Sequence, residues 1–142
     1  MSRFVLDCSV TMSWCFEDEV DAYADGILER LGDDVAVVPA LWALEVANAL
    51  LIAERRMRIS PARSARFISL LDSLPIVLVD LTMTQVVTEG VALGRAHRLS
   101  AYDAAYLATA MGHGLPLASR DRALCSAAGA CGVPLFPPRQ VD

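Results

Sequence analysis

Four acidic residues carry the strongest chemical signal in the sequence: Asp7, Glu45, Asp103 and Asp121. Each lies in or beside a segment with little other polarity. Several carboxylates within a few ångströms of one another cannot all ionise unless cations neutralise them, and oxygen-rich sites select hard ions such as Mg²⁺ or Mn²⁺. Acidic clusters of this kind activate water and stabilise the leaving oxygen in phosphodiester cleavage. If the fold brings the four acids together, they predict a metal-dependent hydrolytic site.

Three of the acids also have an ordinary structural interpretation. Asp7 and Asp121 can each cap the helix that follows. Asp103 can lie with Ser100 in the first turn of a helix, where the positive end of the helix dipole favours a carboxylate. These interpretations stay open for each residue alone and are weaker for the group, because capping does not require the three acids to meet.

Glu45 is the most informative of the four acids. In the fifteen residues from 39 to 53, only Glu45 and Asn48 are polar. A helix here is apolar nearly all round, and we expect it to be buried. A buried carboxylate needs a metal ion, a paired charge or a proton, since burying it ionised and alone is costly.

The elements that position these acids alternate along the chain. We expect strands at residues 3–7, 34–38, 76–80 and 115–118, an edge strand at 133–136, and helices at 9–16, 20–31, 39–53, 61–74, 82–97, 100–111 and 121–128. This alternation predicts a doubly wound α/β fold, in which helices cover both faces of a parallel sheet. Ligands bind at the carboxyl ends of such strands, so the four acids can converge on one rim.

Length and composition limit the architecture. The 142 residues are 55 % hydrophobic, which suits a single domain spanning residues 1–142. No apolar run is long enough to cross a membrane and no signal peptide is visible, so we expect a cytoplasmic protein. The four cysteines form no C-x-x-C pair and, with two histidines, no zinc-ligand pattern. We therefore expect reduced thiols.

The charged residues exclude some mechanisms. All twelve basic residues are Arg, which excludes P-loop NTPases and enzymes that need a catalytic lysine. The net charge of −5 argues against a broad nucleic-acid surface. However, residues 17–34 hold eight acids and one Arg, whereas residues 55–122 hold nine Arg and five acids. One side of the folded protein can therefore be basic, and Arg98 and Arg120 are candidate contacts to nucleic-acid phosphates. Both can equally be solvated surface residues.

Four segments together resemble a known family. Val-Leu-Asp7-Cys-Ser-Val, Leu-Glu45-Val-Ala-Asn-Ala-Leu, Leu-Ser-Ala-Tyr-Asp103-Ala-Ala-Tyr-Leu-Ala and Ala-Ser-Arg-Asp121-Arg-Ala-Leu closely resemble the PIN-domain ribonucleases, in particular the VapC toxins of toxin–antitoxin pairs. The resemblance spans the whole chain and includes the four acids in order. It implies a magnesium-dependent endoribonuclease whose four acids bind Mg²⁺ or Mn²⁺. It also implies a homodimer that is inhibited by a VapB-type antitoxin.

Two serines extend this comparison. Ser119 stands where the family more often has Thr, so the hydroxyl is retained. Ser9 matches a hydroxyl position that often supports the metal site, although it can also cap a helix. We expect an antitoxin to place an Arg among the carboxylates and a helix in an apolar groove beside Trp14 and Trp42.

Two other functions remain open. A PIN-like fold can bind a partner without cleaving RNA, although such a module would not need a buried Glu45. Carboxylates alone also fit a small metal-dependent phosphomonoesterase. Metal binding and a comparison of substrates separate these alternatives.

Overall fold

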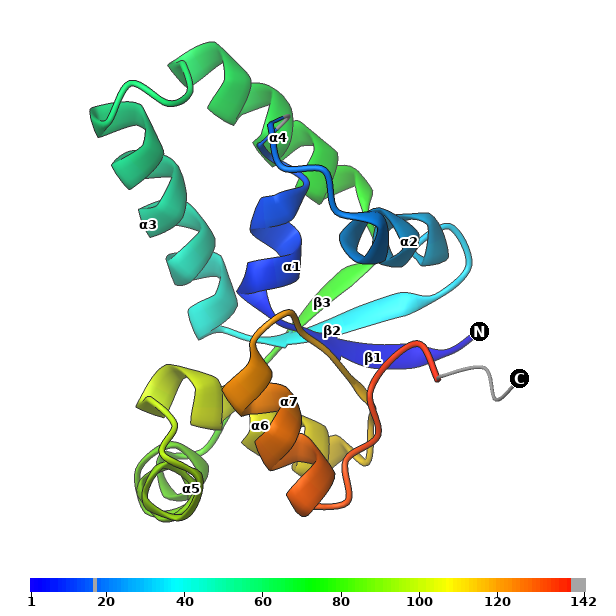
Figure 1. The fold of residues 1–142 in the computed structure, drawn as a ribbon, viewed down its shortest axis with the longest axis vertical. Coiled ribbons are helices and arrows are strands. Elements are labelled where there is room, and N and C mark those ends of the chain that lie inside the picture. The colour runs from blue at the N-terminus through cyan, green and yellow to red at the C-terminus, as the bar shows by residue number, and fades with distance from the viewer. Residues whose placement is uncertain (17, 139–142) are drawn as a thin grey trace.

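In the computed structural model, which describes residues 1–16 and 18–138, four parallel strands form one sheet in the order β3-β2-β1-β4. The strands are β1 (Arg3–Leu6), β2 (Val35–Pro39), β3 (Ile76–Val79) and β4 (Leu117–Ala118). One face is covered by α1 (Cys8–Ser13), α2 (Ala22–Arg30), α3 (Leu41–Arg55) and α4 (Pro61–Ser73). The other is covered by η1 (Thr84–Glu89), α5 (Gly90–His97), α6 (Ala101–His113) and α7 (Arg122–Ala130) (Figure 1). The doubly wound α/β prediction is confirmed.

The central strand β1 organises the core. It pairs with β2 on one side and β4 on the other, and Phe4, Val5 and Leu6 have no exposed surface. A parallel strand covered on both faces is apolar throughout, which is why this run lacks the alternation of a half-exposed strand. The first polar side chain after the strand is Asp7, and it therefore emerges at the carboxyl edge of the sheet.

The helix starts follow the capping signals of the sequence. Ser60 accepts a hydrogen bond from the backbone N–H of Arg63 at the start of α4. Thr82 and Gln85 form the reciprocal pair of a capping box, with distances of 2.9 and 3.2 Å. The helix expected at 82–97 begins there, but its first part is the π-helix η1, which continues into α5.

One prediction of burial is wrong. The helix at 39–53 was expected to be buried, and α3 instead buries one face, with Trp42, Val46 and Leu50 inside. Leu44 is 74 % exposed and Leu51 is 49 % exposed. The helix lies at the edge of its layer (Figure 1), so no element among the described residues covers its outer face.

The expected edge strand at 133–136 is reduced to a single parallel bridge between Leu117 and Leu135. Pro134 has no N–H to donate to a ladder, so it cannot extend the pairing. Phe136 instead stacks on Phe4, with ring centroids 4.2 Å apart.

No helix in the described part of the chain is long and apolar enough to cross a membrane. The four cysteines are free thiols, as expected; Cys8 and Cys15 are buried.

Candidate active site

Asp7 is the centre of a hydrogen-bonded cluster at the carboxyl ends of β1 and β4. It occupies the N-cap position of α1, but its side chain makes no capping bond. Its Oδ2 atom instead accepts hydrogen bonds from Ser9 Oγ at 2.8 Å and from Ser119 Oγ at 2.6 Å. Asp7 is 4 % exposed, and these two bonds satisfy a carboxylate that burial would otherwise destabilise. The capping interpretation of Asp7 is therefore wrong.

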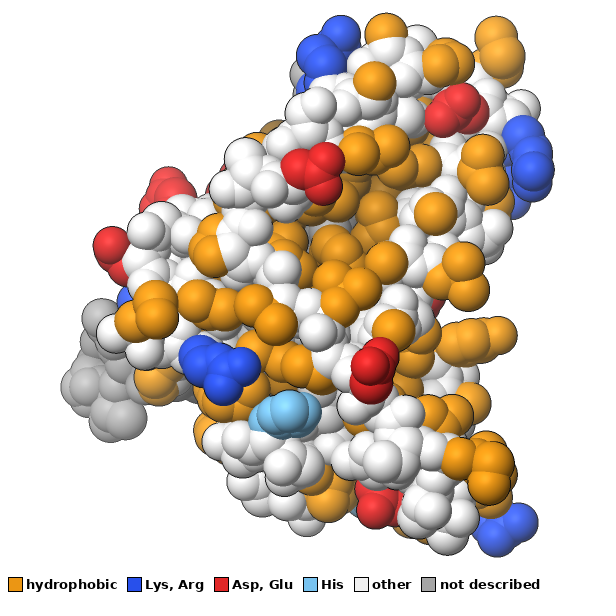
Figure 2. Space-filling model, turned by 180° about the vertical axis from the view of Figure 1, so that it is seen from behind, with side chains coloured by type: hydrophobic (Ala, Val, Ile, Leu, Met, Phe, Trp, Pro, Cys, Tyr) orange, Lys and Arg blue, Asp and Glu red, His pale blue; other side chains and the backbone are white. Residues whose placement is uncertain are grey.

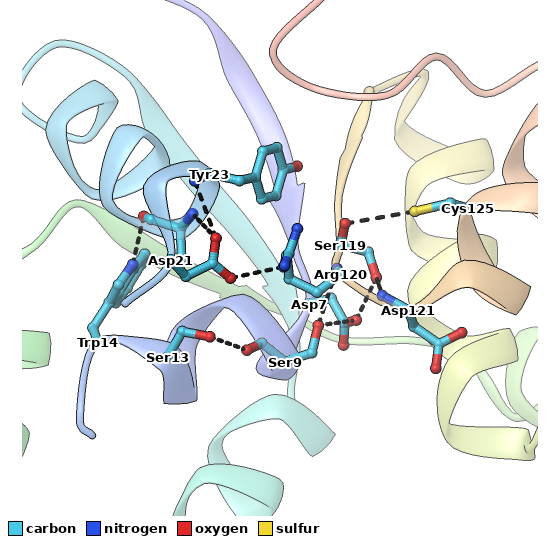
Figure 3. Close-up of polar contacts among 11 residues, drawn as sticks. Asp7, Ser9, Ser13, Trp14, Asp21, Tyr23, Ser119, Arg120, Asp121 and Cys125 are labelled. Atoms are coloured by element: carbon cyan, nitrogen blue, oxygen red, sulfur yellow. Dashed lines mark hydrogen bonds and ion pairs between the residues drawn. The ribbon is translucent and has the colours of Figure 1, made fainter. Parts of the chain in front are cut away.

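The same two hydroxyls hold the loop between β4 and α7 (Figure 3). Ser119 Oγ accepts from the backbone N–H of Asp121 at 3.0 Å, and Ser9 Oγ accepts from that of Arg120 at 3.2 Å. Asp121 does cap its helix, since its Oδ1 accepts from Leu124 N at 2.8 Å. The two serines thus link the loop that carries Asp121 to Asp7; their supporting role at a metal site stays a prediction.

Glu45 reaches the cluster from α3. Its Oε1 atom accepts a hydrogen bond from the hydroxyl of Tyr106 at 2.7 Å, and Tyr106 is fully buried in α6. Burial raises the pKa of Glu45, the tyrosine hydroxyl lowers it, and the charge of Asp7 raises it again. Tyr106 was not among the residues predicted from the sequence. The available signal was its place three residues after Asp103, on the same side of a helix.

Asp103 connects the four acids electrostatically. It lies in the first turn of α6, where its backbone N–H donates to Ser100 Oγ. The pKa of Asp103 is raised to about 6, mainly by burial and then by the charges of Asp7, Asp121 and Glu45. The four carboxylates, which come from four separate segments of the chain, therefore share one region of negative potential.

Nearby thiol chemistry is disfavoured. Cys8 follows Asp7 directly, and burial, together with the charges of Glu45 and Asp7, raises the pKa of its thiol to about 12. A thiol that stays protonated is neither a nucleophile nor a ready metal ligand.

The chemistry of the donor set fits a hard divalent cation. All four groups are carboxylates, and none of the ion pairs seen among residues 1–16 and 18–138 engages them. Oxygen ligands with excess negative charge suit Mg²⁺ or Mn²⁺. The side chains are not closed around a common point, however: in the described residues no group of three or more His, Cys, Asp or Glu is arranged to hold an ion.

The sequence matches the PIN domain family over residues 4–130. The chain belongs to the PIN domain family. No curated protein sequence gives a significant match.

Solved structures share the fold of this PIN domain. The protein PAE2754 from Pyrobaculum aerophilum has a TM-score of 0.66 at 24 % identity, covering 89 % of this chain and 79 % of its own. FitAcB from Neisseria gonorrhoeae has a TM-score of 0.64 at 19 % identity, covering 97 % and 99 %. A toxin–antitoxin complex from Klebsiella pneumoniae has a TM-score of 0.59 at 19 % identity, covering 83 % and 86 %. At such low sequence identities, these comparisons show that the structures share a fold and nothing more specific.

The two arginines suggested as phosphate contacts differ in this PIN domain. Arg120 lies on the loop beside Asp121, and its Nε donates to Asp21 Oδ2 at 2.7 Å. Arg98 ends α5 in the left-handed conformation, with φ of 55°. Of the two, Arg120 is tied by its backbone to the acidic cluster.

The apolar groove expected beside both tryptophans lies beside only one. Trp42 lines a groove of about 330 Å³ between α3 and α4, with Val46, Ile68 and Leu71 among its walls. Figure 2 shows hydrophobic side chains gathered in a hollow on this face of the PIN domain. Trp14 instead belongs to the core, and its indole N–H donates to the carbonyl of Ala24 at 2.7 Å.

Proposed function

We propose that this PIN domain is a metal-dependent endoribonuclease and the VapC-type toxin of a toxin–antitoxin pair, acting in the cytoplasm. The observation that carries the proposal is that four separate segments of the chain bring Asp7, Glu45, Asp103 and Asp121 close enough for the charges of the other three to act on Asp103. Four carboxylates that repel one another at the carboxyl edge of a parallel sheet are explained by a cation that binds between them.

Asp7, Glu45 and Asp103 are the proposed principal ligands, and Asp121 is a ligand to a second ion or through water. A bound Mg²⁺ or Mn²⁺ supplies the charge that activates water and stabilises the leaving oxygen of the phosphodiester.

The chain's own groups prepare this site. Ser9 and Ser119 orient Asp7 through its Oδ2 atom. Tyr106 directs Glu45 from the buried side. The pKa of Asp103, raised to about 6, would fall again once a cation offsets the neighbouring charges.

Cleavage of single-stranded RNA, with and without divalent metal, tests the proposal. We expect cleavage with Mg²⁺ or Mn²⁺, none after exhaustive chelation, and none with Asp7→Asn. A chromogenic phosphomonoester should not be hydrolysed. Cleavage that survives chelation would contradict the metal-dependent mechanism, and phosphomonoester turnover without RNA cleavage would favour the phosphatase alternative. Metal binding without turnover of either substrate would favour a silent binding module.

The antitoxin proposal rests on the groove between α3 and α4. Its apolar walls and the exposed Asp72 among its lining residues suit an amphipathic helix with a basic residue, the helix-in-groove mode of recognition. The Klebsiella pneumoniae neighbour is a toxin–antitoxin complex, which supports a VapB-type partner. An Arg of that partner among the four acids would replace the cation's charge.

Competition with metal tests this form of inhibition. Raising Mg²⁺ should weaken the antitoxin's hold, and substituting its active-site Arg by Ala should restore part of the ribonuclease activity while the complex persists. An antitoxin that is indifferent both to Mg²⁺ and to every Arg in its toxin-binding segment would block the enzyme by another route.

A homodimer is the remaining part of the proposal. The outer face of α3 exposes Leu44, Leu51 and Ile52, and large apolar side chains grouped on one face favour a protein contact. Sedimentation or light scattering of the purified chain gives the oligomeric state.

A further inference from the structure

A second pocket adjoins the acidic cluster on the side of α2. It has a volume of about 350 Å³, and its walls include Tyr23, Ser119, Arg120, Phe136, Pro137 and Pro138. Ser119 and Arg120 belong to the same loop that hydrogen-bonds to Asp7 and Ser9. The pocket therefore shares this loop with the proposed cleavage site, and its volume lies at the small end of the range for ligand sites, roughly 300–1,000 Å³.

Tyr23 gives this pocket a fixed aromatic wall. Its hydroxyl donates to the backbone carbonyl of Phe136 at 2.7 Å, which anchors the far end of the side chain. Burial is the main cause that raises the pKa of Tyr23 to about 12, so the ring stays uncharged. With Pro137 and Pro138 beside it, the pocket offers flat, mostly apolar surfaces.

Arg120 is oriented toward the same place. Its guanidinium carbon lies 5.7 Å from the centroid of the Tyr23 ring. Asp21 holds its Nε at 2.7 Å, while the other carboxylate oxygen of Asp21 accepts from the backbone N–H groups of Tyr23 and Ala24. The carboxylate of Asp21 thus joins Arg120 to the first turn of α2 (Figure 3).

This arrangement leaves one edge of the guanidinium available. The Arg120 side chain is 52 % exposed, against 14 % for Asp21, and Asp21 engages only the Nε atom among the described contacts. A guanidinium that is held by one edge can still donate two parallel hydrogen bonds to a phosphate from the other.

We propose that this pocket is a nucleobase subsite: it takes one unpaired base of the RNA next to the cleaved phosphodiester, with the base stacked on Tyr23 and its phosphate held by Arg120. The inference rests on the proposed ribonuclease function and adds a specificity determinant to it. Proteins read single-stranded RNA by stacking unpaired bases on aromatic rings and arginine planes. Asp21 is a positioning residue for Arg120.

Photocrosslinking tests the contact without relying on cleavage. A short single-stranded RNA carrying 5-iodouridine is irradiated with the wild-type protein and with Glu45→Gln in the presence of Mg²⁺, and the modified peptides are mapped by mass spectrometry. We expect the crosslink at Tyr23. Crosslinks confined to other surfaces would overturn the subsite, even if the protein cleaves RNA.

Matched variants measure the contribution of each group. Tyr23→Leu should weaken RNA binding by about 5- to 100-fold, the range for loss of one base–aromatic stack, whereas Tyr23→Phe keeps the ring and should bind within about twofold of wild type. Thermal melting checks that Tyr23→Leu folds. Equal binding by Tyr23→Leu and wild type would overturn the stacking role.

The phosphate contact has its own readout. Arg120→Gln should lower the slope of log affinity against log salt by about one, since one phosphate contact is lost. Asp21→Asn keeps an acceptor for the α2 cap and removes the charge that orients Arg120. It should therefore lower the salt slope by less than Arg120→Gln does. The exposed Arg56, which is the C-cap residue of α3, gives the control Arg56→Gln with the same change in net charge. Equal slopes for Arg120→Gln and Arg56→Gln would contradict the contact.

Sequencing of the cut ends from a mixed RNA pool separates the two proposals. Loss of base preference at one position in Tyr23→Leu, with metal-dependent cleavage retained, supports both. Cleavage with the same base preference in wild type and Tyr23→Leu would overturn the subsite alone. A crosslink at Tyr23 without any metal-dependent cleavage would overturn the ribonuclease and leave an RNA-binding pocket.

Discussion

Helices α3 and α6 share a mostly apolar composition but differ in their surroundings. Both are long, mostly apolar, and contribute one carboxylate to the acidic cluster. In α6 every residue from Ala104 to Ala110 is buried, because the helix contacts β1, β2, η1, α5 and α7. In contrast, α3 contacts chiefly α1 and β2 and leaves Leu44, Leu51 and Ile52 exposed.

The difference follows from side-chain size. Helix α6 is rich in alanine, which allows neighbouring elements to approach it from several sides. Helix α3 carries leucines and an isoleucine on its outer face, and these side chains stay exposed in the described part of the chain. An apolar helix made of small residues is thus suited to the interior of this domain, and one with large outward residues is suited to a partner.

The largest expected effect comes from changing Glu45, the carboxylate that α3 contributes to the acidic cluster. Glu45→Gln should lower RNA cleavage by more than about 100-fold, since a direct ligand contributes at least as much as the outer partners of a metal site. Its folded state should persist and can gain stability in chelator, because a partly buried charge is removed. Tyr106→Phe, which keeps Glu45 and removes its hydrogen bond, should lose about tenfold.

Cleavage assays and thermal melting of both variants check this prediction. Cleavage at the wild-type rate by Glu45→Gln would mean that Glu45 is structural and that the four-acid assignment is wrong.

The next effect concerns the inside of α6. Leu107 has no exposed surface, so Leu107→Ala should lower the free energy of unfolding by about 2–5 kcal/mol. The matched change on α3, Leu44→Ala, removes a side chain that is 74 % exposed and should cost less than about 0.5 kcal/mol. Urea denaturation of the two variants gives both values, and equal losses would contradict the contrast between the helices.

A third effect depends on pH. The pKa of Asp103 in the folded protein is about 6, above its ordinary value of about 3.9. A raised pKa in an acid favours folding fully below about pH 4, and this contribution is lost as the pH rises through about 6. Without metal, Asp103→Asn should therefore be more stable than wild type at pH 7, by about 1 kcal/mol once solvent screening of this half-exposed group is included.

Denaturation in chelator at about pH 4.5 and about pH 7 measures the change. The difference between Asp103→Asn and wild type should shrink at the lower pH. Asp33→Asn, at an exposed turn residue, controls for the change in net charge, and an equal gain from this variant would attribute the effect to net charge alone.

The smallest effect on folding, within about 0.5 kcal/mol, is expected for Leu44→Ser with Leu51→Ser. The same pair should weaken any dimer formed through the outer face of α3, because two large apolar contacts are removed. Sedimentation of wild type and variant over a range of concentrations measures this. A dimer unaffected by both substitutions would use another surface.

The strands, most helix starts and the separate positions of the acids could be predicted from the sequence, because they depend on local patterns. Ser60 and the pair Thr82 and Gln85 are examples in which a side chain bonds to backbone within one turn. The exposure of Leu44 could not be predicted, since periodicity shows which face of a helix is apolar but not what lies against it.

The same limit applies to the site. That Asp7 and Asp121 follow strands could be read from the chain. The contact between Tyr106 and Glu45 joins residues 61 positions apart, and the ion pair of Arg120 with Asp21 joins the last loop of the sheet to the second helix. Such pairs depend on the three-dimensional path of the chain, and no local pattern encodes them.

The hydrogen bonds that Ser9 and Ser119 make around Asp7 all run in the same direction, from backbone N–H through hydroxyl to carboxylate. Each serine hydroxyl accepts from a backbone N–H and donates to the same carboxylate oxygen, Oδ2. Neither hydroxyl proton can turn elsewhere without giving up its bond to Oδ2, and both lone-pair directions of that oxygen are used. A cation bound at the proposed site would therefore find Oδ1 as the free oxygen of Asp7, and Asp7 would act as a monodentate ligand whose orientation is already set by the two serines.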